Sequence, residues 1–240
     1  MKKLVLITIL FIAGFVRAQA PTYDDLRILY ADGNYDKLIK VSSSYSTHDK
    51  TKNDPLAHLW LARGLYKMSL SGNSEEKYKN AYKEAVAALG KCIKLDKVGD
   101  VQREYEEFIQ EFKMSLIEVI ANDIATPDFK KANSWVLKYY KLDPNSLGAK
   151  YLEAACKFRN ADKGGANAAW KEAEKKLAAL ETIDEWSKAD IALFKLGILQ
   201  SAECYVASRQ VDKAKTLLGK VAQWFEEDEE FKAKYDEIVN

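Results

Sequence analysis

The chain has 240 residues, enough for one or two compact domains or one short helical array. Hydrophobic residues make up 48% of it and charged residues 30%, and this ordinary balance excludes a disordered, collagen-like or coiled-coil chain. The formal net charge is only +1, and with only four prolines long helices are permitted along most of the sequence.

Residues 1–18 are predicted to form a secretory leader that is removed from the mature protein. Two lysines precede Leu4–Val16, a run of 13 residues without a charge. This run is shorter than the ~20 residues that cross a bilayer as a helix, and it suits a leader. Cleavage after Ala18 is favoured, because cleavage after Ala20 would leave Pro21 at the first mature position. The Ala-Gln junction resembles secretory leaders of the Bacteroidota.

The expected mature chain, residues 19–240, is a single periplasmic domain, with secretion as the alternative. The leader ends without a cysteine, so no lipid anchor is expected, and no later apolar run reaches membrane-spanning length. Loss of the leader removes three positive charges and takes the formal net charge from +1 to −2. A mildly acidic chain gives no electrostatic argument for nucleic acid as a partner.

Three cysteines, Cys92, Cys156 and Cys204, lie in three separate predicted helices. Export permits a disulfide, and one bridged pair with a third free thiol stays open as an alternative. Each cysteine has apolar neighbours at helical spacing, where cysteine behaves as a small hydrophobic residue. The favoured prediction is therefore three cysteines that pack in the core.

The most informative feature is an internal repeat. Five segments carry an aromatic or aliphatic residue followed three positions later by a small or aliphatic one: Tyr35–Leu38, Tyr82–Ala85, Phe129–Ala132, Trp170–Ala173 and Val211–Ala214. Their last residues are spaced by 47, 47, 41 and 41 positions. The small residue lets two helices approach closely, and the residue three positions earlier lies on the same helical face. Equal spacings in pairs indicate repeated helical hairpins.

These segments resemble the second helix of tetratricopeptide repeats, which reads aromatic-x-x-Ala and ends in Leu-Asp-Pro. The third segment continues through Val136 and Tyr139 to Leu142-Asp143-Pro144, and Gly33-Asn34-Tyr35 matches the turn between the two helices of a repeat. The family period is 34 residues, so units of 41 or 47 need longer helices or loops, expected at 69–79 and 160–167.

The resemblance implies an all-α protein, a tetratricopeptide-like α-solenoid of about five degenerate hairpins with a C-terminal capping helix. The hairpins are expected at about 22–47, 54–97, 100–143, 145–182 and 186–225, and the cap at 227–239. Prolines at positions 55, 127 and 144 mark helix boundaries. The cap is predicted to cover the last repeat with Phe231, Tyr235 and Ile238.

The chain carries no pattern that indicates catalysis or metal binding. His48 lies in a polar stretch, and His58 follows Asp54 by four residues, which suggests a local pair on a helix. No His-x-x-x-His or Cys-x-x-Cys pattern occurs, so no catalytic residue, metal or cofactor is expected. Gly164-Gly165 is predicted to be a turn between helices, and the acidic run Glu226–Glu230 the start of one.

The sequence thus predicts a non-enzymatic protein-protein interaction scaffold that holds a peptide or protein partner on a concave face. Under the resemblance, eight residues are placed in that groove: Tyr23, Arg27, Tyr30, Trp60, Lys67, Leu152, Arg159 and Glu203. Aromatic and arginine side chains are the usual anchors of such surfaces. The alternatives are an oligomeric structural subunit of an envelope assembly, built through the terminal helix, and an enzyme with an unrecognised site.

Overall fold

The computed structural model describes residues 22–72 and 75–240, and this part of the chain is all-α. The leader predicted over residues 1–18 lies outside the described residues. Twelve α-helices and two short 3-10 helices are present in the described part. The α-helices are α1 (Asp24–Ala31), α2 (Tyr35–Thr47), α3 (Pro55–Leu70), α4 (Ala81–Leu95), α5 (Asp100–Glu104), α6 (Glu106–Ala125), α7 (Phe129–Tyr139), α8 (Leu147–Arg159), α9 (Lys163–Ala178), α10 (Lys188–Ala207), α11 (Val211–Val221) and α12 (Glu229–Val239). The 3-10 helices are η1 (Glu76–Tyr78) and η2 (Ala222–Trp224).

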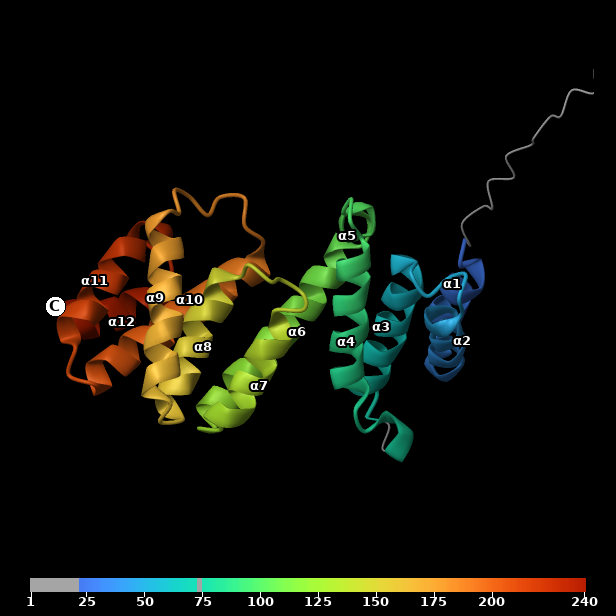
Figure 1. The fold of residues 1–240 in the computed structure, drawn as a ribbon, viewed down its shortest axis with the longest axis horizontal. Coiled ribbons are helices and arrows are strands. Elements are labelled where there is room, and N and C mark those ends of the chain that lie inside the picture. Colours follow the sequence, from blue (N-terminus) through green and yellow to red (C-terminus); the bar gives the residue numbers. More distant parts are fainter. Residues whose placement is uncertain (1–21, 73–74) are drawn as a thin grey trace, which may run out of the picture.

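Helices that are adjacent in the chain pack against one another, and the succession runs along the long axis of the molecule (Figure 1). The pair α1 and α2 lies at one end, and α11 and α12 lie at the other. Within this order α3 packs along α4, α7 packs on both α6 and α8, and α8 packs on α9. Helix α10 lies against α8 and α6 as well as α11, which ties the second half of the chain together.

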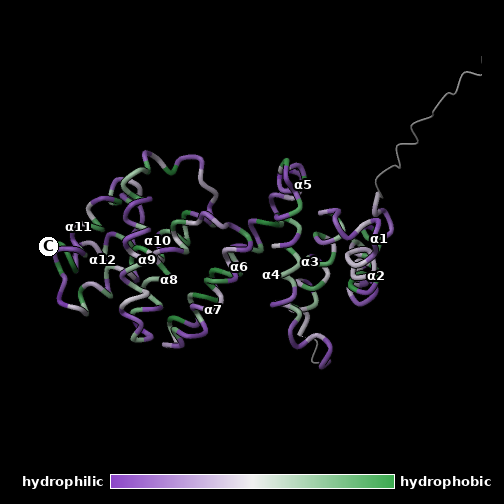
Figure 2. The backbone as a smooth tube through the Cα atoms, viewed as in Figure 1, coloured by the Kyte–Doolittle hydropathy of each residue, from purple (hydrophilic) through white to green (hydrophobic). Residues whose placement is uncertain are grey.

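The repeat motif marks the helix faces that are buried. Its last residues, Leu38, Ala85, Ala132, Ala173 and Ala214, are all 0% exposed. Apolar residues four and seven positions further on, such as Leu89 and Cys92, are also 0% exposed. Figure 2 shows hydrophobic and hydrophilic residues alternating along the helices, as expected where one face of each helix is buried. The predicted core face of the second helices is therefore confirmed.

Predicted helix boundaries are confirmed at the prolines and at the first turn. Asp54 caps α3 by accepting a hydrogen bond from the Leu56 amide at 2.9 Å, and Pro55 is the first helical residue. Gly33 adopts φ 70°, a conformation in which a Cβ is strained, and this reverses the chain between α1 and α2. Local chemistry alone sets these ends.

Three local predictions are wrong. The first helix of the hairpin expected at about 100–143 is not continuous: it is interrupted at Tyr105 (φ −114°, ψ 27°), whose ring packs edge-on against Trp60 of α3 at 6.1 Å. Gly164-Gly165 is not a turn but opens α9, where the Asp162 carboxylate accepts from the Gly165 amide. His58 does not pair with Asp54, because its Nε2 lies 2.8 Å from the Lys52 carbonyl oxygen.

The terminal helix α12 packs on the second half of the molecule as predicted. Phe231 is 2% exposed, and Tyr235 and Ile238 pack on the same apolar cluster. The Asp228 carboxylate caps the helix by accepting from the Phe231 amide at 2.9 Å. The acidic run from Glu226 therefore leads into a helix start, where negative charge is favourable.

Candidate binding surface

Four of the eight predicted groove residues lie near Arg63, a residue that the groove prediction omitted. The four are Arg27 and Tyr30 on α1 and Trp60 and Lys67 on α3. Trp60, Arg63 and Lys67 are three and four positions apart, so they share one face of α3. This spacing is the signal that could have found Arg63, because Trp60 was already assigned to the groove.

Four aromatic rings surround the Arg63 guanidinium. Its Cζ lies 4.1 Å from the ring centroid of Tyr30 and 4.7 Å from that of Trp60. Tyr105 and Phe108 lie at 5.6 and 5.4 Å. The rings come from α1, α3, the α5–α6 junction and α6, so residues up to 78 positions apart form one cluster. Each of these distances is within the ~6 Å over which a cation is attracted to an aromatic face.

The cations that flank Arg63 are each paired with a carboxylate. Arg27 Nη2 lies 3.4 Å from Glu104 Oε1, and Lys67 Nζ lies 3.4 Å from Glu111 Oε1. Within the described residues, by contrast, Arg63 forms no ion pair, and its Nε is buried without a hydrogen-bond partner. Since Arg63 is itself partly exposed, one positive charge at the centre of this surface lacks an acidic partner.

Two further predicted groove residues, Tyr23 and Leu152, are buried, as is Trp60 of the four above, and all three present little surface to a partner. Tyr23 is 2% exposed, and its hydroxyl donates to the Asp54 carboxylate at 2.9 Å. Trp60 is 4% exposed, and its ring packs edge-on against the rings of Tyr30 and Tyr105. Leu152 is 0% exposed in the core.

The last two predicted residues, Arg159 and Glu203, lie together in the second half of the molecule. Arg159 Nη2 lies 2.8 Å from Glu203 Oε2, and Lys234 from α12 reaches the other oxygen of Glu203 at 3.3 Å. The Arg159 guanidinium also covers the ring of Phe129 at 4.8 Å. These charges satisfy one another, so this second group offers fewer unpaired groups than the surface around Arg63.

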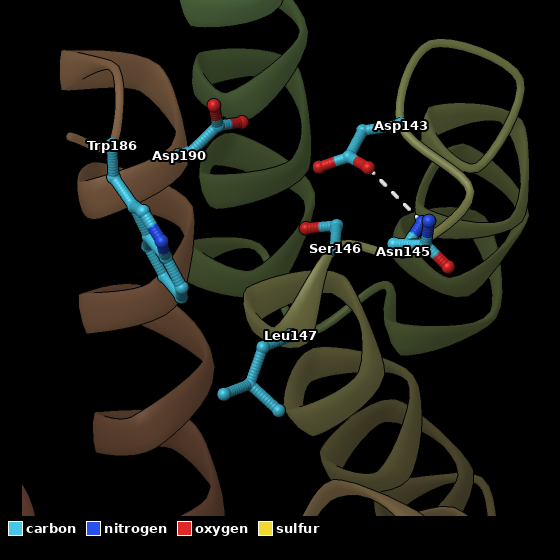
Figure 3. A pocket seen from close by; sticks show the side chains of 6 residues that line it. All are labelled: Asp143, Asn145, Ser146, Leu147, Trp186 and Asp190. Atoms are coloured by element: carbon cyan, nitrogen blue, oxygen red, sulfur yellow. Dashed lines mark hydrogen bonds between the residues drawn. The ribbon is translucent and has the colours of Figure 1, made fainter. Parts of the chain in front are cut away.

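A small polar cavity of about 210 Å³ lies where the α7–α8 connection meets the start of α10 (Figure 3). Asp143, Asn145, Ser146, Leu147, Trp186 and Asp190 line it. Two carboxylates and a hydroxyl group face this cavity, and these are residue types that an acid–base catalytic pair can use.

The polar groups of this cavity have structural partners. Asp190 Oδ1 accepts from Lys113 Nζ at 3.0 Å and from the Tyr139 hydroxyl at 3.2 Å, and Lys113 is 8% exposed. Ser146 Oγ caps α8 by accepting from the Ala149 amide at 3.2 Å. These groups join α6, α7 and α10, which accounts for them as links between helices.

The three cysteines are buried and unbridged. Burial raises the pKa of the Cys92 and Cys156 thiols to about 12, and it raises that of Cys204 as well. Such thiols stay protonated at neutral pH and act as small core residues.

In the described ranges, no cluster of three or more His, Cys, Asp or Glu side chains is arranged to hold a metal ion. No helix among the described residues is long and apolar enough to span a membrane. Comparison with models of known protein families and with curated proteins finds no match to this chain.

Proposed function

We propose that this protein is a non-enzymatic interaction scaffold, a tetratricopeptide-like α-solenoid that binds a peptide or protein partner at the surface around Arg63. The repeat motif, the complete burial of its last residues and the sequential packing of adjacent helices support the solenoid. A location in the periplasm, or alternatively outside the cell, rests on the predicted leader.

The observation that carries the binding function is an unpaired guanidinium held among four aromatic rings. Arginine and aromatic side chains dominate the binding energy of protein interfaces, because they bury much area with little loss of conformational freedom. The rings restrain Arg63 before a partner arrives, which reduces the entropy lost on binding. A carboxylate on the partner would supply the missing charge and accept two parallel hydrogen bonds.

Selection from a random peptide library displayed on phage tests the proposal with the purified mature chain as bait. Peptides enriched on the wild type should carry an acidic residue beside an apolar one. They should bind Arg63→Met at least about tenfold more weakly, since a lost charge-assisted hydrogen bond is worth about 1.5–3 kcal/mol. Lys171→Met, which removes an exposed cation of α9, is the matched control and should leave affinity unchanged.

Enriched peptides that bind Arg63→Met and wild type equally would refute this location for the groove. A selection that enriches no peptide at all would count against the scaffold function itself. Circular dichroism of each variant confirms that helical content is retained, which separates a lost contact from a lost fold.

No specific observation favours either alternative, the oligomeric structural subunit or the enzyme with an unrecognised site. An oligomer built through α12 needs a free apolar face, whereas Phe231 of that helix is buried in its own chain. An enzyme needs converging acid and base groups, whereas Asp190 and Ser146 in the polar cavity are engaged by neighbouring helices.

A further inference from the structure

A second surface with a different chemistry lies on helices α4 and α7. Two cavities, of about 720 and 210 Å³, adjoin there, because Ala87 and Lys141 line both of them. The larger cavity extends to the C-terminal end of α4 and to the residues that follow α7. We call the two together the lysine groove. It shares no residue with the surface around Arg63.

Six lysines line the lysine groove: Lys83, Lys91, Lys94, Lys97, Lys138 and Lys141. Across residues 22–72 and 75–240 none of the six forms an ion pair. Lys138 Nζ instead donates to the carbonyl and hydroxyl oxygens of Ser134, at 3.1 and 2.6 Å. Burial lowers the pKa of Lys138, and the positive charges of Lys83 and Lys141 lower it further. The groove therefore concentrates positive charge that the protein itself does not neutralise.

The two carboxylates that line the lysine groove offset only part of this charge. Asp96 is 9% exposed, and its oxygens accept from the backbone amides of Gln102 at 2.8 Å and Gly99 at 3.2 Å. Glu84 is exposed on α4 and lies at the smaller cavity only. With a formal net charge of only +1, the protein places along one groove six lysines that form no ion pair among the described residues, and this gives the groove a locally positive potential.

The remaining lining of the larger cavity is apolar. Ala87, Gly90 and Ile93 from α4 face Tyr140 and Pro144 from the far side. Gly90 is required for this approach, since a Cβ there would lie 2.6 Å from the Cβ of Lys141. The lysine groove therefore combines apolar lining residues with six lysines, five of which are exposed while Lys138 is half-buried.

We propose that the lysine groove binds an acidic peptide segment that also carries apolar side chains. Lysine ammonium groups attract the carboxylates, while the apolar lining removes the intervening side chains from water. Lys83 and Lys94 are eleven residues apart on one helix, about 17 Å at 1.5 Å per residue. An extended segment of about five residues spans that length at ~3.3 Å per residue.

The apolar lining distinguishes this ligand from a chain of phosphate or sulfate groups. A polyanion without apolar parts would gain from the lysines but nothing from Ile93, Tyr140 and Pro144. Arginine binds phosphate and sulfate through a planar pair of donors, and no arginine of the described residues lines either cavity. The proposal is independent of the surface around Arg63, so either can fail without the other.

Fluorescence anisotropy with a labelled Glu-Leu-Glu-Leu-Glu-Leu peptide and the purified mature chain tests it, at a low salt concentration of about 50 mM. The double charge reversal Lys94→Glu/Lys141→Glu should weaken binding at least about tenfold. The control Lys171→Glu/Lys175→Glu reverses two exposed lysines of α9 and should change the Kd less than about twofold. Equal losses in the two double variants would overturn the proposal, because they would show a response to net charge alone.

The variant Ala87→Lys tests whether the peptide binds in the lysine groove or is only attracted to a positively charged surface. Ala87 is exposed on α4, so the variant should fold, and it adds a positive charge while filling the place where the two cavities meet. The proposal requires weaker binding of the Glu-Leu peptide, by about fivefold or more, since apolar contact is lost. Unchanged or tighter binding would overturn it. So would displacement of the peptide by tripolyphosphate or a sulfated hexasaccharide at concentrations below those of an unlabelled Glu-Leu peptide.

Discussion

A single methyl group added where α10 crosses α8 should destabilise the protein strongly. Gly197 lies inside α10, and a Cβ built there would lie 2.5 Å from the carbonyl oxygen of Gly148 and 3.0 Å from the Cβ of Tyr151. On the facing helix, a Cβ at Gly148 would meet the Leu193 carbonyl group at 2.6–2.7 Å. The two glycines therefore let the backbones of α8 and α10 touch.

The expected loss follows from two opposing effects of Gly197→Ala. Overpacking by a methylene costs about 1–3 kcal/mol, and the upper end applies because a main-chain oxygen cannot rotate away. Alanine returns up to about 1 kcal/mol, since it favours helix over glycine. The net destabilisation is about 2 kcal/mol, which lowers the melting temperature by about 4–8 °C for a chain of this size.

Gly219→Ala is the matched control. Gly219 also lies within a helix, α11, but a Cβ there would meet no atom within 4 Å. The substitution should raise the free energy of unfolding by about 0.5–1 kcal/mol. Urea unfolding followed by circular dichroism measures both midpoints. Shifts of the same sign in the two variants, or no loss in Gly197→Ala, would refute the close crossing of α8 and α10.

Three further outcomes are expected. Lys113→Met should destabilise the chain by about 3 kcal/mol in urea, because it leaves the Asp190 carboxylate without its buried cation; an unchanged midpoint would contradict this. The cysteines should resist a chromogenic thiol reagent at pH 8 until the chain is unfolded, because burial raises the pKa of Cys92 to about 12; fast reaction of the native protein would contradict their burial. Burial by itself would raise the pKa of Glu153, but hydrogen bonds led by that from Lys157 outweigh it and lower the pKa below the ordinary 4.5. The ionised Glu153 carboxylate therefore stabilises the fold above about pH 4.5, and this stabilisation is lost as the pH falls through the pKa that Glu153 has in the folded state. Glu153→Gln should accordingly reduce the loss of stability at acidic pH in a curve of unfolding free energy against pH. An unchanged acidic part of that curve would contradict this.

The candidate surface was only partly predictable from the sequence. Arg27, Tyr30 and Lys67 were placed in a groove by resemblance to tetratricopeptide repeats. In the structure the Tyr30 ring packs on Arg63, Arg27 contacts Tyr105 of the same cluster, and Lys67 follows Arg63 by four residues on α3. Leu152 was placed there by the same resemblance, yet it is fully buried. Units of 41 and 47 residues do not align with a 34-residue period throughout, so a position transferred along the first helix can fall on the core face.

Sequence periodicity by itself indicated most of the helices and the buried face of the second helix of each hairpin. A small residue three positions after an aromatic one, as at Ala85 or Ala132, lets two helices approach closely, so the repeated pattern predicted its burial. Proline and capping residues likewise set helix ends through bonds that reach no further than one turn.

Tertiary structure alone decided which faces meet and which charges stay unpaired. Arg63 becomes a restrained, unpaired cation because rings from α1, α3 and the α5–α6 region surround it. The lysine groove likewise exists because Gly90 allows α4 to approach Lys141. The spacing of residues within one helix does not determine the angle or the offset at which that helix packs on another. These contacts between helices therefore depend on how the side chains of distant segments fit together.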